Sequence, residues 1–173
     1  SGPNSNPERY AQLDQFLSNL HKSKEGFDAA LLLLHNEQAS VQLFATCLLY
    51  DSIRKRWDDM VESQETADRL KVTLINKLTE GAHFQNQSVT NKLSSSLALL
   101  ALRCVPDFWP EPIHDLTLHW AQQPELLLRV LAELAAEFPR IILPLNQRSA
   151  LKSVLLKSAA DIIRVIDVVL RMG

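Results

Sequence analysis

Residues 161–171, Asp-Ile-Ile-Arg-Val-Ile-Asp-Val-Val-Leu-Arg, form the one stretch of this chain in which a β-strand competes with a helix. Its many β-branched residues favour a strand. Its charged residues, however, recur at intervals of three, three and four, which places Asp161, Arg164, Asp167 and Arg171 on one face of a helix. A half-buried strand would alternate every second residue instead. The stretch is therefore predicted to be helical, and the fold class to be all-α.

Working outward from this stretch, eight segments show apolar residues at the three- and four-residue spacing of an amphipathic helix. They span residues 7–22, 24–35, 39–60, 65–82, 88–105, 111–122, 124–138 and 146–172. Short polar turns separate them, and Pro106 and Pro110 prevent the fifth segment from continuing into the sixth. We therefore expect a succession of antiparallel helices.

Taken in pairs, these segments repeat about every 40 residues, which is near the period of HEAT repeats. The expected pairs are 7–36, 39–82, 88–122 and 124–172. One pair cannot bury its apolar face alone, so neighbouring pairs must stack. The expected architecture is an α-solenoid of about four HEAT-type pairs, as a fragment of a right-handed superhelical arch, and a compact helical bundle is the alternative. Residues 1–6 are expected to be an expression remnant or a disordered start.

The composition argues against several classes of protein. The 173 residues include 18 Lys and Arg against 20 Asp and Glu, which gives a net charge of -2. A protein held to nucleic acid by bulk charge needs a basic excess. No uncharged run approaches the roughly 18 apolar residues of a membrane-spanning helix, and the 4 scattered glycines form no glycine-rich phosphate loop. We expect neither direct nucleic-acid binding nor membrane association.

No group of residues in the sequence indicates catalysis or a cofactor. His114 and His119 are five residues apart, which places them on different sides of a helix and prevents them from sharing a metal. The serines at 94–96 lie inside a helix without a neighbouring base, where small side chains favour close packing. Cys47 and Cys104 fall in apolar helical patterns and are expected to be buried thiols. The chain is predicted to be no enzyme and to bind no cofactor or metal.

The sequence contains one basic triplet, Arg54-Lys55-Arg56. It could contact a phosphate group or an acidic partner. Asp51 and the pair at 58–59 flank it, however, so charge pairing along a solvated helix face is the favoured interpretation.

Part of the third predicted helix resembles a known family. The stretch Ser40-Val41-Gln42-Leu43-Phe44-Ala45, continued by Leu48, Ile53, Trp57 and Asp58, resembles the second HEAT repeat of importin-β-type nuclear transport receptors, the karyopherins. In that family the repeat often has an aromatic-Ala start followed by Trp with an acidic neighbour.

Two later stretches resemble one branch of this family. Val105-Pro106-Asp107-Phe108-Trp109-Pro110, after the helix at 97–103, resembles the Pro-Asp-x-Trp-Pro corner of the importin-thirteen and transportin-SR branch. Residues 126–138 resemble the Leu-rich helix that follows in that branch. The similarity extends over about residues 11–170, and the joint order of the motifs is its most specific feature.

The resemblance implies an N-terminal arm of a nucleocytoplasmic transport receptor that shuttles between cytoplasm and nucleus. Such receptors bind the GTP form of Ran through the inner helices of their N-terminal repeats and carry protein cargo in their concavity. Nucleoporins are a further implied partner. The alternative is a HEAT-repeat scaffold that binds a peptide or protein of another complex without Ran-dependent transport.

The expected contact surface is the polar face of the second helix in each pair, which lines the concave side of a solenoid. The candidate partner-binding residues on it are Asp28, Glu65, Arg69, Asn76, Glu80, Glu111, Asp115, His119 and Gln122. Together they would make a mildly acidic inner wall, suited to a basic surface on a partner such as a GTPase. Ordinary solvated helix faces would have the same composition, and the sequence leaves this alternative open.

Overall fold

The chain is entirely helical in the parts that the computed structural model describes, residues 7–81 and 86–173. The helices are α1 (Pro7–His21), α2 (Lys24–Leu33), α3 (Ala39–Lys55), α4 (Trp57–Met60), α5 (Gln64–Gly81), α6 (Gln87–Cys104), α7 (Pro112–His119), α8 (Pro124–Glu137), α9 (Leu145–Lys157) and α10 (Ala159–Met172). The predicted all-α class is confirmed, including the helix over residues 161–171. The start expected at residues 1–6 lies outside the described residues. No helix of the described part is long and apolar enough to cross a membrane.

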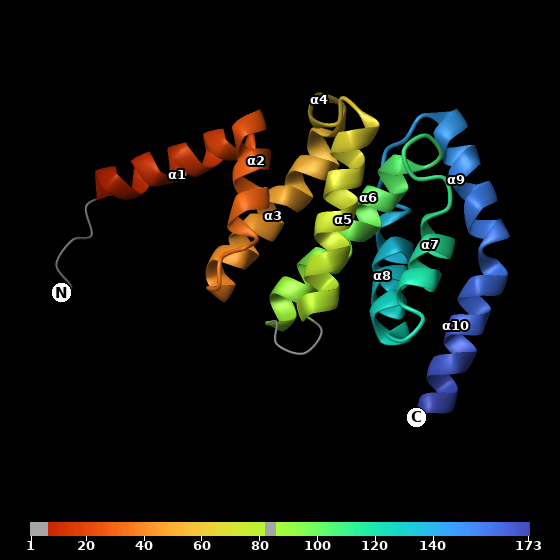
Figure 1. Ribbon diagram of the computed structural model, residues 1–173. Helices are drawn as coiled ribbons and strands as arrows, with labels where there is room; N and C mark the ends of the chain where they lie inside the picture. The colour runs from red at the N-terminus through yellow and green to blue at the C-terminus, as the bar shows by residue number, and fades with distance from the viewer. Residues whose placement is uncertain (1–6, 82–85) are drawn as a thin grey trace.

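The helices form an α-solenoid of two layers (Figure 1). In the rear layer α3 packs on α6 and α6 on α8, and these are among the most extensive helix contacts of the structure. The front layer contains α2, α5, α7 and α10. Its helices pack on the rear layer, most extensively α2 on α3 and α5 on α6. The helix α1 lies at one end of the array and contacts α2 and α3.

The central element of the rear layer is α6, because it contacts α3, α5 and α8 at once. Most of its circumference is buried, which small residues at its middle make possible. Ser94 and Ser96 are fully buried, and each hydroxyl donates to the backbone carbonyl four residues earlier at 2.8 Å. A serine that satisfies its own hydroxyl in this way can lie in an apolar interface. The close packing expected at these serines is therefore what the structure has.

Two predicted helices are divided in the structure. The segment 39–60 breaks at Arg56, whose backbone leaves the helical region with φ -133° and ψ 25°, so that α4 starts at Trp57. The ring of Trp57 then packs edge-on against Phe108, with centroids 6.4 Å apart. The segment 146–172 breaks at Ser158, between α9 and α10. Apolar spacing continues through both breaks, and for this reason periodicity alone does not reveal them.

The corner between α6 and α7 follows the expected proline break. The helix α6 ends at Cys104, two residues before Pro106, and α7 begins only at Pro112. Trp109 fills the corner and is buried, with its Nε1 donating to Asp115 Oδ2 at 2.8 Å. The ammonium of Lys71 lies over the Trp109 ring, 5.3 Å from its centroid.

A close backbone approach joins α1 to α2. At Gly26, in the first turn of α2, a Cβ atom would collide with the carbonyl group of Leu20. The Gly26 amide donates to Ser23 Oγ at 3.1 Å, which makes Ser23 the N-cap of α2. The helix α1 itself has no fully buried residue, and its orientation depends on this turn together with contacts of Leu20 and His21.

We expect Ser94→Leu to lower the free energy of unfolding by about 1–3 kcal/mol, because the added atoms have no space between α6 and its neighbours. The matched control is Ser153→Leu on the exposed side of α9, which should change it by less than about 0.5 kcal/mol. Chemical denaturation measures both values. Equal stability of the two variants would contradict the central position of α6.

A second prediction concerns Cys104, whose thiol is buried at the end of α6. Burial raises its pKa to about 12, from 9.0 for an exposed thiol. Between these values the unfolded chain has lost the thiol proton and the native chain has kept it, so stability falls as the pH rises. The slope from this one group is at most about 1.4 kcal/mol per pH unit.

Cys104→Ala should therefore reduce the decline in unfolding free energy between pH 9 and 12, measured by denaturant titration at each pH. Cys47→Ala is the control, at a thiol that is only partly buried, and should reduce the decline less than Cys104→Ala does. Tyr50, whose pKa burial also raises, contributes the same sign to both variants. Parallel curves for wild type and Cys104→Ala would show that the thiol is not protected.

Candidate partner-binding surface

A hollow of about 520 Å³ lies between the front-layer helices α2 and α5. Asp28 and Arg69 face each other across it, with Asp28 Oδ1 3.4 Å from Arg69 Nη2. Both side chains are mostly exposed, so this ion pair contributes little to stability and both groups can bind a partner. The remaining lining is Leu31, Leu32, His35 and Thr73. The structure thus brings together two of the residues predicted from the sequence and surrounds them with apolar surface.

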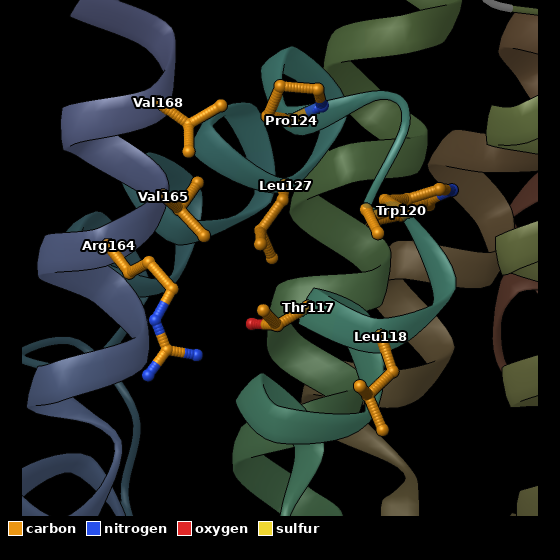
Figure 2. Close-up of a pocket in the computed structure, with 9 residues that line it drawn as sticks. Thr117, Leu118, Trp120, Pro124, Leu127, Arg164, Val165 and Val168 are labelled. Carbon is orange, nitrogen blue, oxygen red and sulfur yellow. The ribbon is translucent and has the colours of Figure 1, made fainter.

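A second hollow, of about 260 Å³, separates α7 from α10 (Figure 2). Val165 and Val168 of α10 face Leu127 of α8, and Thr117 of α7 completes the wall. The guanidinium of Arg164 lies at one end of this mainly apolar groove. Such a surface accepts the apolar side chain of a partner and places a cation beside it.

Four of the other predicted residues are exposed, and within the described part of the chain no contact with a distant segment prevents them from binding a partner. Glu65, Asn76 and Gln122 are exposed, and Glu80 is exposed within a pairing to Lys77 of the same helix at 3.7 Å. These positions agree with either interpretation of the polar face, a contact surface or a solvated one. Their role as partner-binding residues stays a prediction.

Three predicted residues at the sixth helical segment interact with their own chain. Asp115 accepts the hydrogen bond from the buried Trp109 indole. Glu111 is bound by Lys157, and this hydrogen bond lowers the pKa of the Glu111 carboxyl. His119 is exposed, with its ring edge-on to the buried Trp120 at 6.0 Å between centroids. The free negative charge of the front layer is therefore smaller than the sequence alone suggests.

Sequence reasoning overlooked the apolar part of this surface. Leu32 is 76% exposed at the rim of the first hollow, and Leu118 is exposed beside the second. A signal was available, because residues 31–34 are four consecutive leucines and no helix buries four consecutive positions on one side. One or more of them had to face outward.

The surface is suited to binding another macromolecule. Within the described ranges, no three His, Cys, Asp or Glu side chains are grouped to hold a metal ion. What the two hollows offer is apolar surface with charged groups at the edge, which is the usual anatomy of a protein-protein contact.

Comparison with known proteins gives one family. The sequence profile described as Exportin 1-like protein matches residues 86–172, half of the chain. The matched region runs from α6 to α10 and includes the groove between α7 and α10. No individual curated protein matches the chain.

The hydrogen bond from Trp109 to Asp115 generates a prediction. Asp115→Ala should lower the free energy of unfolding by about 1–3 kcal/mol, because it leaves the buried indole donor without its partner. Gln122→Ala, at an exposed candidate residue, should change it by less than about 0.5 kcal/mol. Thermal or urea denaturation decides between them. If Asp115→Ala left the free energy of unfolding unchanged, the Asp115 carboxylate would count again among the groups that can bind a partner.

Proposed function

The chain belongs to the exportin 1-like family of karyopherin-related HEAT-repeat proteins, and on this premise we propose that it is an arm of a nucleocytoplasmic transport receptor. In this proposal it binds a Ran-type GTPase, protein cargo or both on the front layer. It would shuttle between cytoplasm and nucleus and contact nucleoporins during passage. The family is one of transport receptors and not of enzymes.

The observation that carries the proposal is the pair of open hollows on one layer, at α2–α5 and at α7–α10. Each combines exposed apolar side chains with a charged group that no buried network holds. A partner that covered both would span several helices, as partners of solenoid proteins do. The closest packing of the molecule is in the rear layer, which leaves the front-layer faces available.

The finer assignment, to the importin-thirteen and transportin-SR branch, is also a proposal. Its support is the sequence of the corner 105–110 and the helix that follows it. In the structure this corner is built around the buried Trp109, so the residues that resemble the branch are also those that shape the turn.

The decisive experiment titrates the chain with Ran in its GTP and GDP forms. We expect tighter binding of the GTP form. Leu32→Asp should weaken that binding by about tenfold or more, because it puts a charge into the apolar rim of the α2–α5 hollow. Arg69→Glu should weaken it as well, since it places two carboxylates face to face.

The matched control is Leu156→Asp on α9, a leucine of nearly the same exposure, 78% against 76%, which lines neither of the two hollows. It should leave the affinity unchanged. Absence of binding to either nucleotide form would sink Ran-dependent transport and favour the scaffold alternative, in which the same hollows hold a peptide of another complex.

A further inference from the structure

A basic hollow lies at the rear layer, and none of the residues that line it lines the two hollows of the proposed partner surface. The rear helices α3, α6 and α8 run in the same direction, so their carboxyl ends meet at one edge of the layer (Figure 1). There the chain encloses a hollow of about 230 Å³. Arg54, Lys55, Arg103 and Arg140 line it, against a single carboxylate, that of Glu137. Two members of the basic triplet noted in the sequence therefore share a site with two distant arginines.

The one carboxylate is already neutralised. Glu137 is only 4% exposed. Its Oε1 accepts a hydrogen bond of 2.6 Å from the Tyr50 hydroxyl, and its Oε2 one of 3.3 Å from Arg54 Nη1. Arg54 also donates to the Tyr50 oxygen at 2.8 Å. The negative charge of Glu137 thus balances the positive charge of Arg54. It does not neutralise the other three cations of the hollow.

Arg103 is a half-buried cation without a carboxylate partner among the described residues. Its Nη2 donates to the carbonyl of Arg54 at 2.6 Å and its Nη1 to that of Ile142 at 3.3 Å, while its Nε is buried with no hydrogen-bond acceptor. Burial among Leu99 and neighbouring apolar residues lowers the pKa of its guanidinium. A charge in such surroundings gains more from an added anion than an exposed one does.

The surrounding negative groups do not cancel this excess. Asp51 lies 3.8 Å from Lys55 and takes up that charge, and Asp58 acts on Arg103 only at a distance. The carboxyl ends of the helices are partially negative. They explain why Arg103 donates to the carbonyl of Arg54. Arg140 is exposed at the mouth and pairs with no carboxylate of the described residues.

We propose that this hollow binds a compact oxyanion of the phosphate type, held between Arg103 inside and Arg140 at the mouth. Planar guanidinium groups present paired N–H donors that match phosphate oxygens. The apolar floor excludes water and strengthens these contacts. The site is separate from the front-layer hollows, and its existence does not depend on the proposed transport function.

The test uses inorganic phosphate as the probe and thermal unfolding of the whole chain as the readout, at constant ionic strength with chloride as the reference. Bound anion stabilises the native state by mass action, so the melting temperature should rise with phosphate concentration. Above the dissociation constant, the rise should be proportional to the logarithm of the phosphate concentration. Arg140→Gln should weaken phosphate binding about tenfold, and Arg103→Gln should abolish the specific rise.

The control is Lys152→Gln, which removes an exposed cation of α9 that does not line the hollow. It should retain the wild-type response. If Arg103→Gln does not fold, the double variant Lys55→Gln/Arg140→Gln replaces it and should lose most of the response. An equal rise in all variants would mean a general salt effect and would overturn the site.

Calorimetric titration then identifies the carrier of the phosphate group. Phosphoserine that binds more tightly than inorganic phosphate would indicate a phosphate attached to a protein, whereas equal affinities would indicate the free ion. Absence of binding heat for either probe, together with absence of stabilisation, would overturn the proposal.

Discussion

The packing of α6 against α3, α5 and α8 is the constraint on which the rest of the molecule depends. It requires a helix that is apolar nearly all round and narrow at its middle, and Ser94 and Ser96 meet this requirement with hydroxyls bonded to their own helix. Because α6 lies in the rear layer, the burial that stabilises the fold is concentrated there. The front-layer helices need only one buried side each, and their other side remains open to solvent.

Because the rear layer is buried and the front layer is open on one side, the two layers differ in the kind of surface that they offer. On the front, Leu32 and Arg69 border a hollow in which the ion pair of Arg69 with Asp28 is mostly exposed. On the rear, Tyr50 and Arg54 form a partly buried network with the buried Glu137 at the ends of the helices. Arg103 extends it without a carboxylate of its own. Exposed apolar rims suit a large protein surface, whereas a small charged recess suits a small anion.

Sequence periodicity was sufficient for the helices, because burial on one side of a helix imposes a three- to four-residue repeat. It predicted the helix at 161–171 and the proline break after α6. It could not predict the turns at Arg56 and Ser158, since the apolar spacing runs on through both and only tertiary contacts such as Trp57 with Phe108 select the break. The individual site residues were harder still. Asp115 occupies a polar helix position, and only the fold shows that its carboxylate accepts a hydrogen bond from the buried Trp109 indole.

The turn at Gly26 has a consequence for how variation acts on this protein. The helix α1 buries no residue completely, and its direction is set where the backbone of α2 touches the carbonyl of Leu20. Any side chain at position 26 would force these backbones apart and change the direction of α1. The core around α6 does not include this turn. The direction of α1 and the stability of the fold therefore depend on different positions of the chain. A substitution at the pivot could redirect the end of the array yet pass unnoticed in a screen that scores only heat resistance.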